Sequence, residues 1–403
     1  MHKFAIIADD LTGAMDTGGQ FAQAGFRTLV HIGQVGQPPG EIAVVDTESR
    51  ETTPEDAARR ARDAAQGLQG APIYKKIDST LRGHIGQELD AVMDALGLTR
   101  AVVCPAFPAA GRAVVEGRLW VHGVPLRQTD FAQDPLCPPT DHIASLLAGQ
   151  SRRPVAEVPL QVVRKGWEAL AEALAARPEP ILVVDAAEPD ELAALARALA
   201  HLGNETLGCG SAGLAQALPG AFALEPEGRA RPRPPASAGP VLVVAGSQRA
   251  ITRQQIQVAA ERGAEVVHLS PPLDEAAARH AAAQAAQHLQ AGRDVILTTA
   301  FQPHLPGQDQ AIARRLGQVA AEIAHHQAPA GWVLTGGAVA FAVCRRLGIP
   351  SLEIGGEVAP GIPFGRVVGG PWDGTPLVTK AGGFGAEDAL AAAIAFLHGG
   401  KRE

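Results

Sequence analysis

The chain of 403 residues is longer than one hydrophobic core usually supports, so two domains are expected. With 46% hydrophobic and 19% charged residues, no apolar run of about 18 residues and no charged-then-apolar leader at Met1, the composition predicts a cytoplasmic globular protein. The net charge of −7 comes without a basic stripe, and only 4% of residues are aromatic. Neither nucleic acid nor a membrane is therefore an expected partner, while a homo-oligomer stays open.

Short apolar runs of strand length alternate with alanine-rich stretches of helical spacing in the first half of the chain. Such alternation is typical of βαβ units and a largely parallel sheet. The expected strands cover residues 4–8, 28–32, 42–46, 73–77, 101–104 and 181–185, and the expected helices cover residues 54–68, 166–176 and 189–202.

The domain boundary is predicted at residues 225–240, which read EPEGRARPRPPASAGP and have no apolar periodicity. A first domain would then cover residues 1–224 and a second residues 241–403. The alternation restarts after the linker, so the second domain is also expected to be α/β. Its predicted strands are residues 241–245, 266–269, 295–299 and 332–334, and its predicted helices are residues 275–291 and 308–326.

The motif ADDLTGAMDTG at residues 8–18 places two carboxylates directly after the first strand. In an open parallel sheet, ligands gather at the carboxyl ends of strands, so Asp9 and Asp10 are candidates for binding or catalysis. The alternative is that one of them only caps the following helix while Thr12 closes a turn.

The segment KKIDSTLRGHIGQEL at residues 75–89 concentrates charge at a strand-to-helix junction. The guanidinium fork of Arg82 suits a carboxylate, and hydroxyl and backbone donors at a helix start would favour an anion. A third strand end, DTESRE at residues 46–51, brings Arg50, which could reach the same anion. The alternative for each segment is a solvated charged surface. The residues of the junction are Lys75, Lys76, Asp78, Ser79, Thr80, Leu81 and Arg82.

The second domain carries glycine-rich turns after its apolar runs, at residues 245–256, 334–340, 356–365 and 379–390. Glycines let a backbone approach a phosphate closely, and free N–H groups bind it. No segment matches the P-loop pattern G-x-x-x-x-G-K-[ST].

The segment GCGSAG at residues 208–213 matches the dinucleotide pattern G-x-G-x-x-G, but residues 204–207 read as a poor strand, and no acidic strand end follows about twenty residues later. A tight strand-to-helix turn is the better interpretation.

The four cysteines are scattered, with no C-x-x-C pair and no zinc spacing, which predicts reduced, mostly buried thiols.

Taken together, these motifs resemble those of the four-carbon acid sugar kinase family, in order and over nearly the whole chain. The motifs that carry the resemblance are ADDLTGAMDTG, DTESR, KKIDSTLRG, GSQRAITRQQI, TGG, APGIP and KAGGFG. The resemblance implies an ATP-dependent kinase that phosphorylates the terminal hydroxyl of D-threonate, D-erythronate or a 3-oxo-tetronate. It looks closest to the D-threonate and D-erythronate members. It also implies two α/β domains with largely parallel sheets and an active-site cleft between them.

By matching motifs, the resemblance implies a sugar-acid site in the first domain and an ATP site in the second. One departure is that members commonly read GGET where this chain has Gly336-Gly337-Ala338-Val339. The implied sugar-acid residues are Asp9, Asp10, Arg50, Lys76, Ser79, Thr80, Leu81 and Arg82, and the implied nucleotide residues are Ser247, Gly336, Gly337, Ala338, Val339, Gly361, Gly382 and Gly383.

Phosphoryl transfer needs alignment, charge neutralisation and proton removal. Asp10 or Asp78 is expected to orient or deprotonate the acceptor hydroxyl, and Lys380 to neutralise phosphate charge. Mg²⁺ is expected with ATP, but its protein ligands cannot be identified from the sequence. The competing hypotheses are a nicotinamide-dependent sugar-acid dehydrogenase, based on GCGSAG, and a non-catalytic sugar-acid-binding protein.

Overall fold

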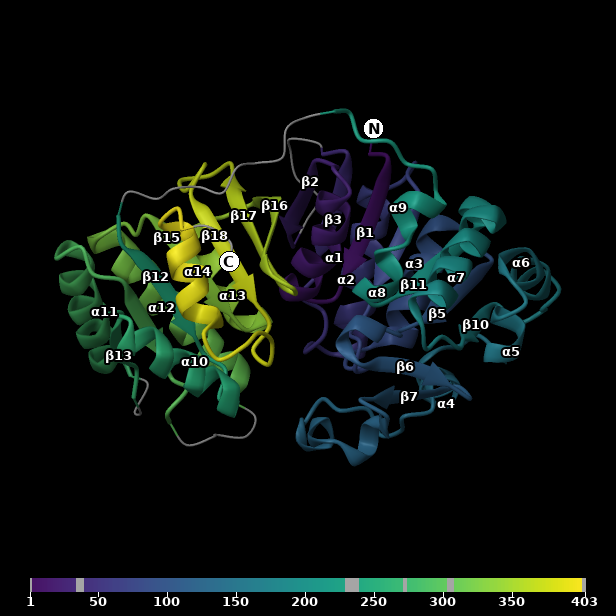
Figure 1. The fold of residues 1–403 in the computed structure, drawn as a ribbon, viewed down its shortest axis with the longest axis horizontal. Coiled ribbons are helices and arrows are strands. Elements are labelled where there is room, and N and C mark those ends of the chain that lie inside the picture. The colour runs from purple at the N-terminus through teal and green to yellow at the C-terminus, as the bar shows by residue number, and fades with distance from the viewer. Residues whose placement is uncertain (1, 34–39, 229–238, 271–273, 303–307, 401–403) are drawn as a thin grey trace. The chain divides into compact units, whose positions relative to one another are not determined.

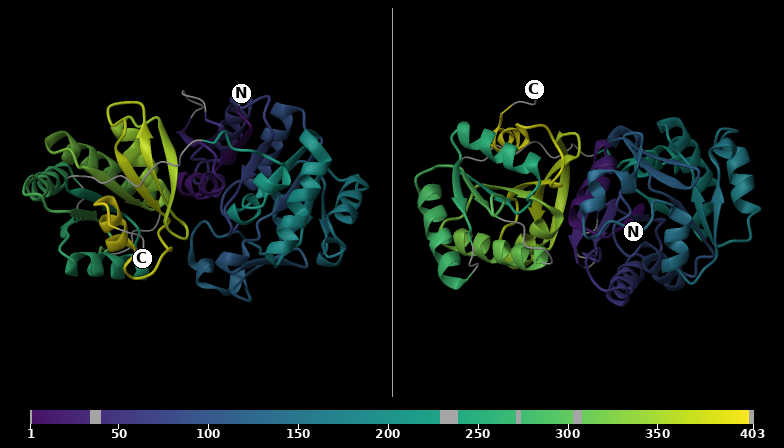
Figure 2. Two further views of the ribbon diagram at one scale, coloured as in Figure 1. Left: turned by 45° about the horizontal axis from the view of Figure 1, so that its top comes forward. Right: turned by 90° about the horizontal axis from the view of Figure 1, so that it is seen from below.

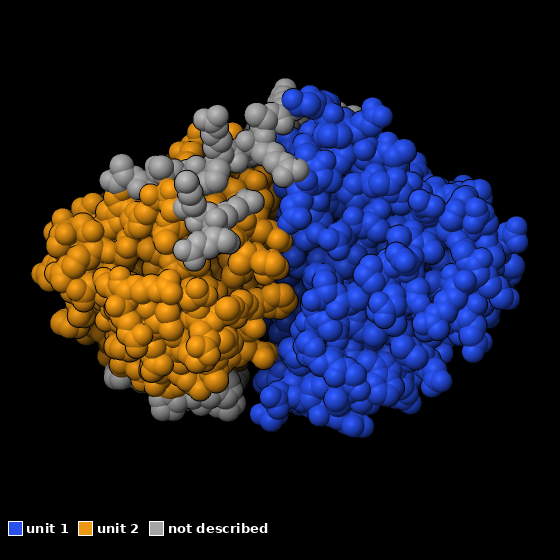
Figure 3. Space-filling model, in the orientation of Figure 1, with its two compact units in different colours: residues 1–28, 33–229 blue, residues 29–32, 230–403 orange. Residues whose placement is uncertain are grey.

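The computed structural model describes residues 2–33, 40–228, 239–270, 274–302 and 308–400. The chain divides into two compact units, unit 1 (residues 1–28 and 33–229) and unit 2 (residues 29–32 and 230–403), coloured separately in Figure 3. Each unit is built on a largely parallel sheet with helices, which confirms the predicted α/β class. Residues 229–238 of the predicted linker lie outside the described residues. None of the helices in the described ranges is long and apolar enough to cross a membrane.

The sheet of unit 1 runs β3-β1-β4-β11-β5-β10-β9, with every neighbouring pair parallel. Figure 1 labels β3, β1, β11, β5 and β10 in this order. Its strands are mostly short apolar runs that are buried on both faces, as expected for a parallel sheet covered by helices. The strands are β1 (Phe4–Ala8), β3 (Ile42–Asp46), β4 (Ile73–Lys76), β5 (Arg100–Cys104), β9 (Val155–Val158), β10 (Ile181–Val184) and β11 (Thr206–Gly210).

Helices cover both faces of this sheet (Figure 2). The helix α2 packs against α3 and α3 against α4, whereas α1, α7, α8 and α9 contact one another in a second layer. Two layers arise because the chain leaves β1 in one direction along the sheet and leaves β3 in the other, and right-handed crossovers then place α1 and α2 on opposite faces. The helices are α1 (Leu11–Gln23), α2 (Pro54–Gly67), α3 (Ile85–Leu96), α4 (Ile143–Gln150), α5 (Leu160–Val163), α6 (Trp167–Ala175), α7 (Pro189–Leu202), α8 (Ala212–Ala215) and α9 (Leu218–Ala221).

Local sequence signals set several of these helix starts. Asp10 is the N-cap of α1, and its Oδ1 accepts a hydrogen bond from the Gly13 N–H at 3.0 Å. Thr53 caps α2 ahead of Pro54, which suits the first helical position. Helix α3 ends where Gly97 adopts φ 67°, the left-handed conformation that glycine tolerates best.

An insertion between β5 and α4 forms a separate antiparallel sheet in the order β6-β7-β8. Its strands are β6 (Arg112–Val115), β7 (Arg118–Val121) and β8 (Val124–Pro125), followed by 3-10 turns at Leu126–Gln128 and Asp130–Gln133. The insertion carries Asp134, which reaches the candidate site described below.

In unit 2 the strands run β13-β14-β12-β15-β18-β17-β16-β2. The pairs from β13 to β18 are parallel, and the pairs that join β18, β17, β16 and β2 are antiparallel. The strands are β2 (Thr28–Ile32), β12 (Val241–Ala245), β13 (Glu265–His268), β14 (Val295–Thr298), β15 (Gly331–Thr335), β16 (Ser351–Ala359), β17 (Ile362–Val368) and β18 (Pro376–Lys380).

The structure differs from the predicted domain division at β2. This strand was expected within the first domain, but its residues 29–32 belong to unit 2. The reason is a pairing between segments far apart in the chain: His31 lies opposite Ser351 of β16, and its Nδ1 lies 2.8 Å from the Ser351 hydroxyl.

The helices of unit 2 also form two layers. α10 packs against α14, and α12 packs against both α11 and α13. The core between the sheet and the first layer joins apolar side chains of β12, β15 and β18 to those of α10 and α14, including Val243, Val333, Val378, Ile256 and Leu390. The helices are α10 (Ala250–Glu261), α11 (Glu275–Gln290), α12 (Asp309–His326), α13 (Gly337–Leu347) and α14 (Ala389–Leu397).

Candidate active site

The sugar-acid candidates gather at the carboxyl ends of β1 and β4 in unit 1. These neighbouring strands continue into helices on opposite faces of the sheet, β1 into α1 and β4 into α3. Such a switch in direction opens a crevice outside the strand ends, which is the usual ligand position in this architecture. The loop after β1 provides Asp9 and Asp10, and the loop after β4 provides residues 77–84.

Arg50 links the two carboxylates that follow β1. Its Nε donates to Asp9 Oδ2 at 2.8 Å, and its Nη2 donates to Asp9 Oδ1 at 2.9 Å and to Asp10 Oδ1 at 2.6 Å. Burial opposes ionisation of Asp9, but the Arg50 guanidinium outweighs it and holds the pKa of Asp9 below its usual value. The fork of Arg50 is thus occupied by protein carboxylates.

Asp10 serves as a helix cap and as a member of this cluster. Besides capping α1, it accepts a hydrogen bond on Oδ2 from the Thr12 hydroxyl at 2.6 Å. A Cβ added to Gly13 would lie 2.8 Å from the Lys76 ammonium, so only glycine lets that cation approach the start of α1. The capping alternative considered from the sequence is therefore correct for Asp10, and it coexists with a position beside Arg50 and Lys76.

Asp78 and Arg82 form an ion pair within the loop after β4. Arg82 Nε lies 2.8 Å from Asp78 Oδ2 and Nη2 lies 3.0 Å from Oδ1, while Nη1 lies 3.3 Å from Asp134 Oδ2. Thr80 also donates its hydroxyl to Asp78. Burial raises the pKa of Asp78, but Arg82 and Arg50 overcome it and keep the pKa well below the usual range. Asp78 therefore holds its charge and is a poor acceptor for a proton.

One expectation about this loop needs correction. The sequence placed Ser79, Thr80 and Arg82 at the start of a helix, but α3 begins only at Ile85, with His84 as its N-cap. Residues 78–82 instead form a turn in which Leu81 has φ 64° and its N–H donates to the Asp78 carbonyl at 3.0 Å. The fork of Arg82 is occupied by Asp78, so contact of Arg82 with a substrate carboxylate stays a prediction.

The two lysines of β4 have different surroundings. Lys75 forms an ion pair with Glu88 of α3, at 2.7 Å between Nζ and Oε2, and neither side chain is exposed beyond 2%. Lys76 is 4% exposed. Among the residues that the structure describes, its ammonium has no ion pair or hydrogen bond. Lys76 is therefore a buried cation at the strand ends that acts on Asp9 through space but has no direct partner there, so its ammonium can meet a ligand.

Sequence reasoning missed Asp46 and Glu48, although it singled out their segment for Arg50. Asp46 ends β3 and lies opposite Ala8 of β1, so it is beside the Asp9–Asp10 pair. Burial, with Asp10 and Asp9 nearby, raises the pKa of Asp46 well above its usual value, and burial with Asp46 does the same for Glu48. One feature of the sequence could have identified Asp46: it ends a predicted strand, and the other predicted strand end at Asp9 and Asp10 is also acidic.

The nucleotide candidates lie at the carboxyl ends of the unit 2 strands. β12 continues into α10 and β15 into α13, which belong to different helix layers, so these neighbouring strands also form a switch point. Ser247 follows β12. Its Oγ would lie 2.6 Å from a Cβ added to Gly382, which follows β18. The fold thus brings Ser247 against residues 381–386, called the glycine loop below.

Two further predicted nucleotide segments have distinct surroundings. Gly336 is the N-cap of α13, with φ 95° and no side-chain cap. Val339 in the first turn is 6% exposed and packs toward Gly246, so its side chain belongs to the interior and only its backbone could face a ligand. Gly361 turns the chain between β16 and β17 with φ 74°, where the Phe384 ring of the glycine loop would lie 2.8 Å from an added Cβ.

Lys380 does not have the surroundings expected for a phosphate ligand. It is 1% exposed, and its Nζ donates to the carbonyls of Ala381, Gly382 and Phe384 at 3.0, 3.1 and 3.1 Å. All three hydrogens of the ammonium therefore have acceptors inside the protein. This geometry does not support the catalytic role predicted for Lys380.

The remaining motifs of unit 1 have structural explanations. β11 was not predicted because Gly208 and Gly210 interrupt it, yet GCGSAG is the strand-to-helix turn that was expected, leading from β11 into the short α8. A Cβ on Gly210 would meet the Cys104 carbonyl, and one on Gly213 the Ala106 carbonyl at 2.7 Å, so close packing explains these glycines. Burial raises the pKa of the Cys104 and Cys209 thiols to about 12, as expected for unreactive cysteines.

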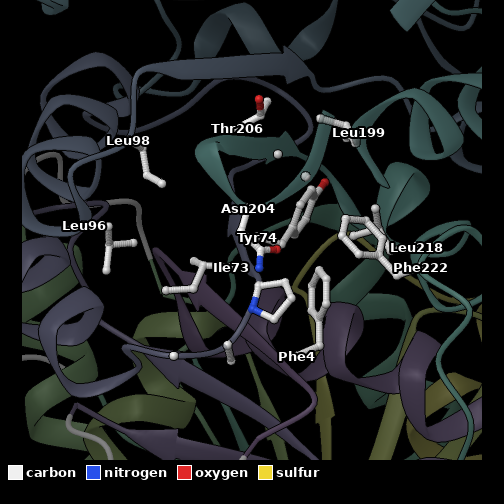
Figure 4. A pocket seen from close by; sticks show the side chains of 15 residues that line it. Phe4, Ile73, Tyr74, Leu96, Leu98, Leu199, Asn204, Thr206, Leu218 and Phe222 are labelled. Atoms are coloured by element: carbon white, nitrogen blue, oxygen red, sulfur yellow. The ribbon is translucent and has the colours of Figure 1, made fainter. Parts of the chain in front are cut away.

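A pocket of about 220 Å³ lies at the opposite ends of the unit 1 strands from the candidate site (Figure 4). Its lining includes Phe4, Ile73 and Thr206, which begin β1, β4 and β11, so it opens at the amino ends of the strands. The polar cluster is at the carboxyl ends. This pocket is therefore separate from the candidate site.

Comparison with known proteins matches both halves of the chain. The family described as the sugar-binding N-terminal domain matches residues 4–218, and the family described as the nucleotide-binding C-terminal domain matches residues 242–390. A D-threonate kinase of Salmonella typhimurium is 40% identical over 98% of each chain, and a D-erythronate kinase of Heliobacterium modesticaldum is 34% identical over 98% of this chain and 97% of its own.

Solved structures show the same similarity. A Salmonella typhimurium protein superposes with a TM-score of 0.83 at 25% identity, covering 98% of this chain and 99% of its own. A Haemophilus influenzae protein gives a TM-score of 0.74 at 25% identity, covering 98% of this chain and 100% of its own. With both domain families matched in order and full-length relatives at this level of identity, the chain belongs to the four-carbon acid sugar kinase family.

Proposed function

We propose that this protein transfers the γ-phosphoryl group of ATP to the terminal hydroxyl of a four-carbon sugar acid, with D-threonate or D-erythronate as the expected acceptor. Membership of a kinase family supports the reaction, and the names of its full-length relatives support the acceptor. The observation that carries the substrate class is the buried, unpaired charge of Lys76 at the switch point of unit 1.

Lys76 is proposed to bind the carboxylate of the acid. A small acid has few atoms from which to gain affinity, so its full charge must contribute much of it. The other cations at these strand ends are already paired: Arg50 with Asp9 and Asp10, Lys75 with Glu88, and Arg82 with Asp78. In the described part of the chain the Ser79 side chain also has no hydrogen-bond partner, so its hydroxyl is available to the same ligand.

Asp10 is proposed to orient the attacking hydroxyl and to accept its proton. It lies beside Arg50, and the Lys76 ammonium approaches the same helix start. Asp78, the other candidate, is held in its charged form by Arg82 and Arg50. Asp10 also pairs with Arg50, but among the described residues its Oδ2 accepts only from the Thr12 hydroxyl. Both oxygens of Asp78, in contrast, accept from Arg82. Asp10 is therefore the better candidate for the base.

ATP is proposed to bind at the strand ends of unit 2, where the glycine loop, Ser247 and the start of α13 at Gly337 provide backbone and hydroxyl donors. Within the described ranges no three His, Cys, Asp or Glu side chains lie close enough to hold a metal ion. We therefore expect Mg²⁺ to arrive on the nucleotide phosphates, whose charge it would neutralise. The inter-domain cleft and the cytoplasmic location stay predictions.

The test is an ADP-release assay with ATP, Mg²⁺ and a panel of four-carbon sugar acids. We expect release with D-threonate or D-erythronate and none with the matching neutral sugar alcohols, which lack the carboxylate. Absence of ADP release with every acid, or equal turnover of acid and alcohol, would contradict the proposal. Reduction of NAD⁺ by an acid, followed by absorbance, would instead indicate a dehydrogenase.

A further inference from the structure

The glycine loop is held by three buried side chains that all act on its carbonyl groups. They are Thr252 and Gln255 of α10 and Lys380 of β18, exposed by 0%, 0% and 1%, and they are called the carbonyl clamp below. Thr252 Oγ1 donates to the Gly382 carbonyl at 2.8 Å. Gln255 Nε2, which carries two hydrogens, lies 3.0, 3.2 and 2.9 Å from the carbonyl oxygens of Phe384, Gly385 and Ala386, and Lys380 donates to those of Ala381, Gly382 and Phe384.

The clamp thereby turns the carbonyls of the loop inward. Of the residues 381–386, all but Gly383 have a carbonyl oxygen within hydrogen-bond distance of a donor of the clamp. Because three carbonyl oxygens face the Gln255 side-chain amide, its nitrogen rather than its oxygen must point toward them. The arrangement is thus fixed by donor and acceptor chemistry.

A planar trans peptide directs its N–H opposite to its C=O, so inward carbonyls leave the following N–H groups facing away from the clamp. The N–H groups of Gly382, Gly383 and Gly385 make no backbone hydrogen bond among the described residues. Successive free N–H groups form a concave site for anions such as phosphates. The absence of side chains on these glycines lets the backbone approach such a group.

We propose that Thr252, Gln255 and Lys380 are positioning residues that hold the glycine loop with its N–H groups turned toward the nucleotide phosphates. This inference rests on the proposed function, since it requires that the loop bind ATP. It assigns to Lys380 a structural task in place of direct charge neutralisation. It also gives α10 a part in nucleotide binding through residues that do not themselves touch the ligand.

The decisive variant is Gln255→Glu, which keeps the size of the side chain and replaces the donor by a carboxylate facing three carbonyls. The matched control is Gln257→Glu, the same change at an exposed position of the same helix. For Gln255→Glu we expect the Kd of ADP, measured by calorimetry, and the KM of ATP to rise roughly tenfold or more, a loss typical of one or two hydrogen bonds. At saturating ATP, kcat and the KM of the sugar acid should stay close to the wild-type values, and Gln257→Glu should change neither quantity.

Thr252→Val provides a second test that leaves the shape of the clamp intact, because it removes one hydroxyl from an isosteric side chain. It should weaken ADP binding by a smaller factor, roughly threefold to tenfold. Lys380→Met should likewise raise the KM of ATP. A fall in its kcat of roughly 10² or more at saturating ATP would instead indicate that Lys380 acts on the transferred phosphoryl group and would overturn the positioning role.

The wild-type titration separates this inference from the proposed function. If the wild-type protein does not bind ADP, the proposed function fails and the inference fails with it. If the wild type binds ADP, and folded Thr252→Val or Gln255→Glu protein binds it equally well, the proposed function stands and the clamp has no part in it.

Discussion

Lys75 and Glu88 form an ion pair in the interior of unit 1, with 2.7 Å between Nζ and Oε2 and with exposures of 0% and 2%. Glu88 Oε1 also accepts a hydrogen bond from the Ser49 hydroxyl at 2.8 Å, and Ser49 directly precedes Arg50. The pair therefore connects β4, α3 and the loop that presents Arg50. Breaking a buried pair on one side leaves an uncompensated charge in the interior.

Glu88→Gln is therefore expected to lower the free energy of unfolding by about 3–5 kcal/mol. Urea denaturation followed by circular dichroism measures it, with the exposed Glu172→Gln as the control. Replacing both partners, as Lys75→Met with Glu88→Leu, should recover much of the loss because no charge is then stranded. A loss in the double variant as large as in Glu88→Gln would contradict this explanation.

Lys76→Met should weaken binding of the sugar acid because it removes the unpaired cation and keeps the apolar stem. We expect the KM of the acid to rise by roughly 10- to 100-fold, the range for a hydrogen bond to a charged group. The KM of ATP should not change. Steady-state kinetics with each substrate varied in turn measures both values, and the exposed Lys165→Met serves as the control. An unchanged KM for the acid would exclude Lys76 from the carboxylate site.

Asp10→Asn should lower kcat/KM by a factor on the order of 10² to 10⁴, the usual contribution of a general base. The amide oxygen can still cap α1 through Gly13, so the helix start should persist. Activity should therefore fall, while the midpoint of thermal unfolding should stay close to the wild-type value. Near-normal turnover in a folded Asp10→Asn protein would limit Asp10 to capping and to its contact with Arg50.

Asp46 should make stability depend on pH above the range in which carboxyl groups ordinarily titrate. Its folded-state pKa is raised well above the usual value by burial and by Asp10 and Asp9, while Arg50 partly opposes the shift. Folding therefore takes up a proton above pH about 4, and the free energy of unfolding should fall by up to about 1.4 kcal/mol per pH unit as the pH rises toward the folded-state pKa. Asp46→Asn mimics the protonated acid and should flatten this slope, as measured by denaturation between pH 5 and 8. An unchanged slope would show that Asp46 is charged in the folded protein.

Lys380 should make nucleotide affinity depend on pH in the alkaline range. Burial lowers the pKa of Lys380 to about 8, and in the described part of the protein no neighbouring charge contributes to the shift. Deprotonation leaves two hydrogens for three carbonyls, so the clamp should loosen and the Kd of ADP should rise as the pH increases from 7 to 9.5. Lys380→Met should bind ADP weakly with little dependence on pH. A constant wild-type Kd over this range would contradict the link.

Local patterns in the sequence were sufficient to predict most of the strands and helices and the α/β class. Runs such as Phe4–Ala8 are apolar throughout, and the signals at Asp10 and at Thr53-Pro54 are those of helix starts. The motifs also showed which strands end in polar residues, and the carboxyl ends of strands are where ligands gather in an open parallel sheet. Position along the chain alone therefore identified Asp10, Arg50, Asp78 and Ser247 as members of the two polar edges.

Only the tertiary structure decided which charge meets which. The sequence shows that Arg82 lies four residues after Asp78, but it does not show that the Asp78 carboxylate occupies the guanidinium fork. Nor does it show that Lys75 pairs with Glu88 while Lys76 has no such partner in the described part of the chain. It also could not reveal that β2 pairs with β16, or that Gln255 and Lys380, 125 positions apart, hold the same loop. Such contacts depend on the packing of distant segments, and the energy of a buried charge is set by its partners in space rather than by its neighbours in the chain.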